Sequence, residues 1–292
     1  MGISATAIYV SGLSRSVARL RRAAWPAGGY FISGIVLSAL IVTLTAIGPN
    51  LAPTSPYSQD LSAVLQAPGP VHRFGTDALG RDVLSRVLYG GRLTLEAGVA
   101  IVLSSFLVGL ILGAIGGFFG GVLDEVIMRG ADLILSFPWL VLAMAVAAAL
   151  GPSISHGVLS LVIVWWPVYA RVARGEVLRV KSLEYVESSL AAGADPARIL
   201  WRTILPNIIG VPMSMTPLDF GRALGAFAGL SFLGLAARPP AAELGVMLNE
   251  ARTMPLQWWI AFFPGAALAV CILASNLLGI AIRRRSPLGA LR

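Results

Sequence analysis

Long apolar runs recur along this chain and constrain its fold more than any other feature. A helix needs about 20 mostly apolar residues to cross a bilayer, where every backbone polar group must be paired within the protein. Charged residues make up only 12% of the sequence, about half the fraction that is usual in a soluble domain. The sequence therefore predicts an all-α polytopic membrane protein.

Six runs are candidate membrane spans. The first follows an arginine-containing segment and has a poor signal-peptide cleavage pattern, so we interpret it as an uncleaved span. The other five lie near 97–116, 133–150, 157–173, 207–235 and 258–282. The predicted organisation is a cytoplasmic segment 1–29, a first transmembrane helix 30–47, an extracytoplasmic segment 48–93, a five-helix core 94–282 that includes a cytoplasmic loop 176–206, and a cytoplasmic tail 283–292.

The distribution of basic residues predicts the orientation, because Lys and Arg resist translocation. With the N-terminus inside, the cytoplasmic segments hold 15 of the 22 basic residues and the outer segments hold 6. Both termini are therefore expected in the cytoplasm. The net charge of +8 follows this topology and gives no sign of nucleic-acid binding.

Sequence motifs that would power or catalyse a reaction are absent. The only lysine is Lys181, which follows Val180, so the chain has no G-x-x-x-x-G-K-[ST] phosphate-binding loop. It also has no H-E-x-x-H and no G-x-S-x-G motif. Two histidines and the single Cys271 are too few for a cluster of zinc ligands. We therefore expect no catalytic residue, metal site or cofactor in this chain.

The charged stretch EYVESSLAAGADPARILWRTILPN has the pattern of two short helices joined by a bend. Gly193 suits the left-handed position that ends a helix, and Asp195 with Pro196 forms an N-cap and first-turn pair. Pro206 is expected to stop or kink the path into the next span. Such a segment could dock into a groove on a partner protein or fold onto its own bundle, and these residues alone leave both open. A DNA-reading helix-turn-helix is disfavoured because the spans hold the segment at the membrane.

The fifth predicted span is the most irregular, with two prolines and several glycines. Asp219 and Arg222 are three residues apart, so they can pair on one helix face. Charges at membrane depth are costly and usually face a cavity or a partner. Pro217, Asp219 and Arg222 are therefore candidate lining residues of a pathway, and the alternative is a structural pair near a membrane boundary.

The segment FGTDALGRDVLSRVLYGGRLTL at 74–95 has the pattern of a short outer helix between glycines. Asp77 is a candidate N-cap of this helix. Arg81 and Arg86 lie on successive turns near Asp77 and Asp82. We interpret the segment as structural rather than as a substrate site.

The spacing of Glu187-Ser188-Ser189, Gly193 and Thr203-Ile204-Leu205-Pro206 resembles the EAA loop of ABC-importer permeases, although Ser-Ser stands where the family usually has Ala-Ala. Segments 74–95, 230–248 and 262–279 resemble the C-type subunit of dipeptide, oligopeptide and nickel permeases. The resemblance implies a six-helix type I importer (MetI-like) fold and a loop that couples to a cytoplasmic ATPase. The loop residues implied are Glu187, Ser188, Ser189, Leu190, Gly193, Asp195, Pro196, Ile199, Leu205 and Pro206, with apolar contact assigned to Leu190, Ile199 and Leu205.

The resemblance also implies a function and a set of partners. The chain would form half of a peptide pathway across the inner membrane of a prokaryotic cell. Its partners would be a homologous B-type permease, two P-loop ATPases or one fused ATPase that bind ATP and Mg, an extracytoplasmic substrate-binding protein and membrane lipid, but no nucleic acid. Nickel or haem remains open as the substrate, and an ion-coupled secondary transporter remains open as a different class.

Overall fold

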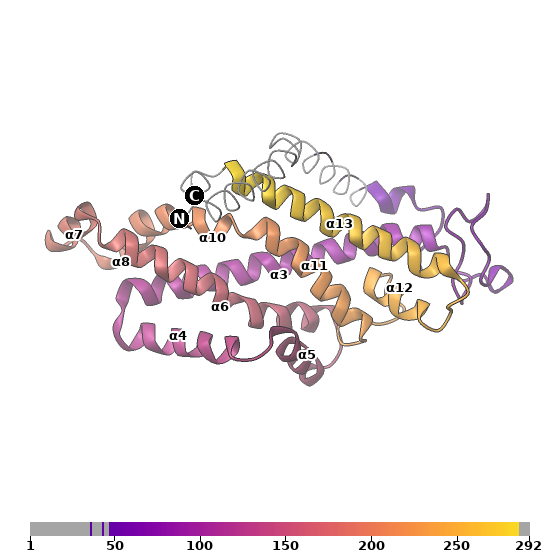
Figure 1. Cartoon of the computed structure of the whole chain (residues 1–292), viewed down its shortest axis with the longest axis horizontal. Coiled ribbons are helices and arrows are strands. Elements are labelled where there is room, and N and C mark those ends of the chain that lie inside the picture. The colour runs from indigo at the N-terminus through magenta and orange to yellow at the C-terminus, as the bar shows by residue number, and fades with distance from the viewer. Residues whose placement is uncertain (1–35, 37–42, 44–46, 286–292) are drawn as a thin grey trace, which may run out of the picture.

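The computed structural model describes residues 36, 43 and 47–285, so segment 1–29, nearly all of the predicted first span 30–47, and residues 286–292 lie outside it. The described part of the chain is helical, with one isolated β-bridge between Thr76 and Asp82. Four long helices run along the long axis of the molecule (Figure 1). They are α3 (Val83–Phe119), α6 (Ile154–Lys181), α11 (Thr216–Phe232) and α13 (Trp258–Arg285). The all-α prediction holds for this part of the chain.

Shorter elements flank this bundle and occupy its two ends (Figure 1). α4 (Gly121–Leu135) and α5 (Trp139–Leu150) lie beside α6. The 3-10 turn η1 (Leu61–Ala63) and α12 (Leu244–Ala251) lie toward one end. At the opposite end are α7 (Glu184–Ala191), α8 (Pro196–Ile199), a π-helical turn η2 (Leu200–Ile204), α9 (Leu205–Ile208) and α10 (Gly210–Met213).

α3 and α6 pack with their backbones in direct contact along a stripe of glycines. A Cβ atom added at Gly113 would lie 2.2 Å from the carbonyl oxygen of Ala170, and one at Gly109 would lie 2.5 Å from that of Trp166. Gly117 continues the same spacing of four residues, which places all three glycines on one face of α3. Small residues at this spacing let transmembrane helices approach closely. No larger side chain fits at Gly113 without separating the two helices.

The described part of the chain contains three or four of the predicted spans. Three described helices are long and apolar enough to cross a membrane, namely Val83–Phe119, Ile154–Lys181 and Trp258–Ile280. The predicted span 133–150 is not one straight helix, because α4 and α5 meet at 96° and would count as a fourth, broken span. Pro138 accounts for the break, since it lacks an N–H and disfavours helix in the residue before it. The predicted span 207–235 is divided among α9, α10 and α11, so six spans remain a prediction.

The start of α3 corrects our expectation for Asp77. The helix begins at Val83, and its N-cap is Asp82, whose carboxylate accepts a hydrogen bond from the Ser85 N–H at 2.8 Å. The predicted short outer helix is therefore the first part of α3, which continues unbroken to Phe119. Asp77 lies further from the helix start because the chain turns at Gly80 before Asp82, as the Gly80 φ of +69° shows.

Asp77 instead belongs to a buried ionic network. Its Oδ2 atom accepts from Arg81 Nε at 2.6 Å and from Arg86 Nη1 at 2.5 Å. Glu250 at the end of α12 accepts from Arg81 Nη2 at 3.0 Å and from Arg86 Nη1 at 2.6 Å. The Arg86 side chain is only 1% exposed. The network therefore ties the start of α3 to α12.

Replacing Asp77 with asparagine is expected to destabilise the fold by about 3 kcal/mol, because removing one member of a buried ion pair leaves an uncompensated charge. The apparent Tm of the detergent-purified protein measures the effect. Glu96→Gln is the matched control, since the Arg92–Glu96 pair is exposed and such pairs contribute about 0–1 kcal/mol. Equal Tm shifts in the two variants would contradict a stabilising role for the network.

Candidate functional site

The loop of residues 182–206, here named the protruding loop, extends from the end of α6 beyond the bundle (Figure 1). Its first helix, α7, ends in a bend at Gly193, whose φ is +81°. The Gly193 N–H donates to the Leu190 carbonyl at 3.0 Å, and the Ala194 N–H donates to the Ser189 carbonyl at 3.1 Å. These two bonds are the Schellman pattern, which requires a left-handed residue at this position. The predicted role of Gly193 in ending the helix is confirmed.

The second helix of the protruding loop starts as predicted. The Asp195 carboxylate accepts from the N–H of Ala197 at 3.3 Å and from that of Arg198 at 3.1 Å. Pro196 is the first residue of α8, where its missing N–H costs nothing. The bend and the second helix start therefore follow from residues that are neighbours in the sequence.

The path after α8 does not stop at Pro206, because the chain remains helical through this residue. Residues Leu200–Ile204 form a π-helical turn, and the Leu205 N–H donates to the Leu200 carbonyl five residues back. Pro206 has no N–H, so a regular α-helical pattern cannot continue through it. The helix widens by one residue just before the proline, as π turns commonly do within α-helices.

One face of the protruding loop is anchored in the core of its own bundle. Val186 and Ile204 are fully buried, and they pack in one cluster with Phe118 of α3 and Val177 of α6. Ile199 belongs to the same cluster and is 4% exposed. Its side chain therefore supports the loop from within, and it is not available for the external apolar contact that we expected of it.

The remaining predicted residues lie on or near the surface of the protruding loop. Leu190, Ser189 and Leu205 are partly buried. The residues that are exposed are Glu187, Ser188, Gly193, Asp195, Pro196 and Pro206. Glu187 and Leu190 also line a shallow, open pocket of about 430 Å³ between α6 and α7. The loop thus has one anchored face and one face available to another molecule.

Lys181 fixes the end of α6, a role that sequence reasoning missed. Its Nζ atom donates to the carbonyl oxygen of Phe118, near the end of α3, at 2.7 Å. The same ammonium lies 5.4 Å from the centroid of the Phe118 ring. Basic side chains near helix ends commonly bond free carbonyls, so a lone lysine in the last turn of α6 was the available signal.

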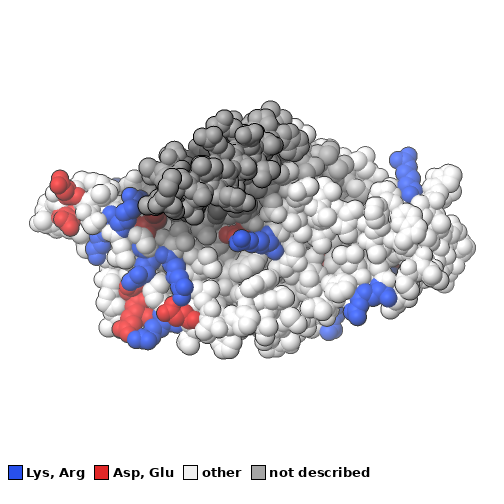
Figure 2. All heavy atoms as spheres, viewed as in Figure 1, with Lys and Arg blue, Asp and Glu red and all other residues white. Residues whose placement is uncertain are grey.

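Ion pairs hold α4 against α6 near the same end of the molecule. Arg174 forms a bidentate pair with Asp124, with both N–O distances at 2.6 Å. Arg171 pairs with Asp132 at 2.6 Å. Figure 2 shows charged side chains gathered at the end that carries α7 and α8, whereas the rest of the visible face is mostly uncharged. These contacts fix the base from which the protruding loop extends.

The predicted pair on α11 is present. Arg222 Nη1 donates to Asp219 Oδ1 at 3.2 Å, and the hydroxyl group of Tyr169 on α6 donates to Asp219 Oδ2 at 2.8 Å. The Asp219 side chain is 15% exposed, whereas that of Arg222 is 75% exposed. Asp219 is thus held between two helices, and Arg222 extends from it to the surface.

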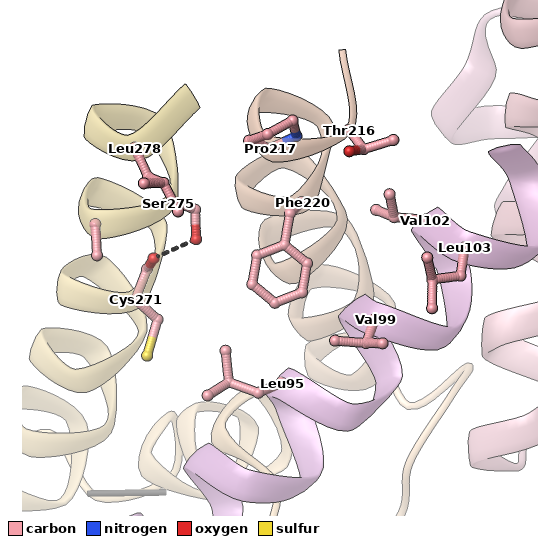
Figure 3. A pocket seen from close by; sticks show the side chains of 11 residues that line it. Leu95, Val99, Val102, Leu103, Thr216, Pro217, Phe220, Cys271, Ser275 and Leu278 are labelled. Carbon is pink, nitrogen blue, oxygen red and sulfur yellow. Dashed lines mark hydrogen bonds between the residues drawn. The ribbon is translucent and has the colours of Figure 1, made fainter. Parts of the chain in front are cut away.

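Pro217 does not join this pair. It lines an apolar pocket of about 390 Å³ between α3, α11 and α13, together with Val99, Phe220 and Cys271 (Figure 3). Neither member of the α11 pair lines this pocket. At 100° per residue, Pro217 lies roughly opposite Arg222 on the helix. Pro217 and Arg222 therefore face different sides of α11, and the lining role of the three residues stays a prediction.

Glu243 is a second structural residue that sequence reasoning missed. It is fully buried and caps α12, with Oε2 accepting from the Val246 N–H at 3.0 Å and Oε1 accepting from the Thr94 hydroxyl group at 3.0 Å. Burial raises the pKa of this carboxyl group, and the hydrogen bonds to it act in the opposite direction. An acidic residue just before a short helix indicates an N-cap only weakly. Its second partner, Thr94, is distant in sequence and could not be predicted.

The described part of the chain is thus a multi-pass membrane protein, with apolar spanning helices, an ion-paired end and a protruding helix–bend–helix. Residues 106–286 match the family described as "Binding-protein-dependent transport system inner membrane component". The chain belongs to this family.

Several permease proteins align with most of this chain. The "Probable D,D-dipeptide transport system permease protein DdpC" of Escherichia coli is 40% identical, with 86% of this chain and 85% of the relative covered. The dipeptide transport system permease protein DppC of Haemophilus influenzae is 37% identical, with 86% and 87% covered. The glutathione transport system permease protein GsiD of Pectobacterium atrosepticum is 40% identical, with 77% and 75% covered. The predicted kinship with permeases of this type is confirmed.

Proposed function

We propose that this chain forms half of the translocation pathway of an ATP-driven peptide importer. Separate ATPase subunits would contact the protruding loop, and their conformational change would reach the helix bundle through it. The observation that carries this proposal is the loop itself, a helix–bend–helix at the end of a spanning helix in a member of a transport family. Its inner face is anchored by buried residues, so a force on its outer face would move α6.

The contact with the ATPase would use the exposed face of the loop. Glu187 and Leu190 line a shallow open pocket that could receive a side chain of the partner. Ser188, Asp195 and Pro196 are exposed beside the bend. In this proposal Gly193 sets the bend, whereas Ile199 and Leu205 support the loop from the bundle side. A short helix laid on a groove is a common mode of protein recognition.

The proposed substrates are peptides, because the named relatives transport dipeptides and glutathione. The names of these relatives favour peptides over nickel or haem. An ion-coupled transporter working alone has less support, since these relatives are described as permease components of larger systems.

The proposed assembly contains a homologous B-type permease, two P-loop ATPases or one fused ATPase, and an extracytoplasmic substrate-binding protein. ATP and Mg would be bound by the ATPases. The protruding loop and both chain termini would lie in the cytoplasm, and the end with α12 would face the binding protein. The count of basic residues in the sequence supports this orientation.

Purification of the tagged chain from its native membrane in mild detergent tests the assembly. We expect a second permease and P-loop ATPases to copurify, and we expect ATP-dependent peptide uptake once the complex and its binding protein are placed in liposomes. A chain that is recovered alone and drives uptake from an ion gradient would contradict the proposal.

A further inference from the structure

Arg222 carries its charge near the middle of the helix bundle. On the same helix, Leu224 packs against Gly98, near the middle of α3, and Gly221 packs against Asn276 in the central part of α13. The Arg222 side chain is nevertheless 75% exposed. Because a charged group is costly against lipid, this face of α11 is expected to border a polar space or another protein.

The guanidinium group of Arg222 retains unused hydrogen-bonding capacity. Within residues 47–285, its one protein hydrogen bond runs from Nη1 to Asp219, whose other oxygen is occupied by Tyr169. Asp219 thus lowers the free-energy cost of placing the Arg222 charge within the bundle, and it holds the Nη1 atom of the guanidinium group in place. Nε and Nη2 have no partner among these residues, and together they form an edge that can bind a carboxylate with two parallel hydrogen bonds.

The helix face beside this edge has room for a ligand. Gly229 lies two turns further along α11, on the same face as Arg222. A Cβ atom added at Gly229 would meet nothing within 4 Å. A ligand group could therefore lie along this surface without displacing a side chain of the described bundle.

We propose that Arg222 binds the C-terminal carboxylate of the peptide during its passage and makes the permease favour peptides with a free carboxyl terminus. This inference rests on the proposed function as a peptide permease. Every unmodified peptide carries this carboxylate whatever its side chains, so one fixed guanidinium group serves substrates of different sequence. Asp219 and Tyr169 are positioning residues that hold the guanidinium group in place.

The test uses the complete importer in liposomes, with its binding protein saturated by alanyl-alanine or by alanyl-alanine amide. The amide removes the carboxylate charge at nearly constant size. With Arg222→Gln, we expect uptake of the free acid to fall about tenfold or more relative to uptake of the amide. Arg222→Lys should give an intermediate ratio, because it keeps the charge and loses the planar fork.

Arg129→Gln is the matched control. Its side chain is 76% exposed and pairs with Glu125 one turn away, as Arg222 pairs with Asp219. The ratio of acid to amide uptake should remain at the wild-type value in this variant. Since the binding protein is the same in every experiment, a changed ratio reports on the permease.

One outcome overturns the proposal, namely an unchanged ratio of acid to amide uptake in Arg222→Gln. An equal loss of both peptides would give this result and would indicate a purely structural role. Should Arg222→Gln fail to assemble, the ratio in Arg222→Lys decides in the same way. A wild-type complex that transports neither peptide would refute the peptide-permease function itself, and with it this inference. The wild-type measurement therefore separates the two failures.

Discussion

Replacing Gly193 with valine is expected to abolish most ATP-driven uptake while leaving the permease inserted and assembled in the membrane. The glycine has a φ of +81°, and nothing lies within 4 Å of the position where a Cβ would be. The defect would therefore arise from backbone strain, which for a β-branched residue in this region costs about 1–3 kcal/mol. We expect ATP hydrolysis to continue without matching uptake, because the bend would no longer hold α7 and α8 in one geometry. The ratio of peptide transported to ATP hydrolysed measures this effect.

Gly193→Asn is the matched control, since asparagine tolerates the left-handed conformation better than other residues do. It should retain most uptake, whereas valine should not. If Gly193→Val transported peptide with the wild-type ratio, the bend would not be needed for coupling. If both variants lost uptake equally, the side chain at this exposed position would be the cause, rather than the conformation.

Replacing Gly113 with valine is expected to prevent stable folding of the permease. A Cβ atom there would lie 2.2 Å from the carbonyl oxygen of Ala170, and its other nearest neighbours are also backbone atoms of that residue. Backbone cannot turn aside as a flexible side chain can, so α3 and α6 would have to separate. We expect a cost at or above the upper end of the about 1–3 kcal/mol that is typical of overpacking. The yield of monodisperse protein in detergent and its apparent Tm measure the loss.

Gly130→Val provides the comparison for this prediction. Gly130 also lies within a helix, but an added Cβ would meet nothing within 4 Å. Valine and glycine differ by only a few tenths of a kcal/mol in helix propensity, so this variant should behave like the wild type. A similar loss of yield in both variants would mean that valine in any helix is harmful and that the close contact is not the cause.

The features predicted correctly from the sequence depend on neighbouring residues. Gly193 ends α7, and Asp195 caps α8, through hydrogen bonds that reach at most five residues along the chain. The pairing of Asp219 with Arg222 likewise follows from helical spacing. Such interactions are set by local backbone geometry, so the residue types at fixed offsets are sufficient to predict them.

The features that were missed depend on distant parts of the chain. Asp77 was expected to cap a helix, but Arg81, its direct partner, also binds Glu250, which lies 169 residues further on. Ile199 has an apolar side chain that would suit either a partner surface or a core, and only the packing against α3 and α6 decides between them. The break within the predicted span 133–150 was missed for a similar reason, because breaks near prolines depend on how neighbouring helices pack.

The two connections of the protruding loop to the bundle differ in stiffness. α6 extends about 42 Å and enters the loop directly, and its backbone packs closely against α3 on both sides of its internal Pro167. On the return side, the chain passes through a π-helical turn and two helices of four residues each, whose interrupted hydrogen bonding can deform at lower cost. A displacement of the loop should therefore reach the far end of the molecule mainly through the closely packed helices α3 and α6, while the short helices α9 and α10 deform.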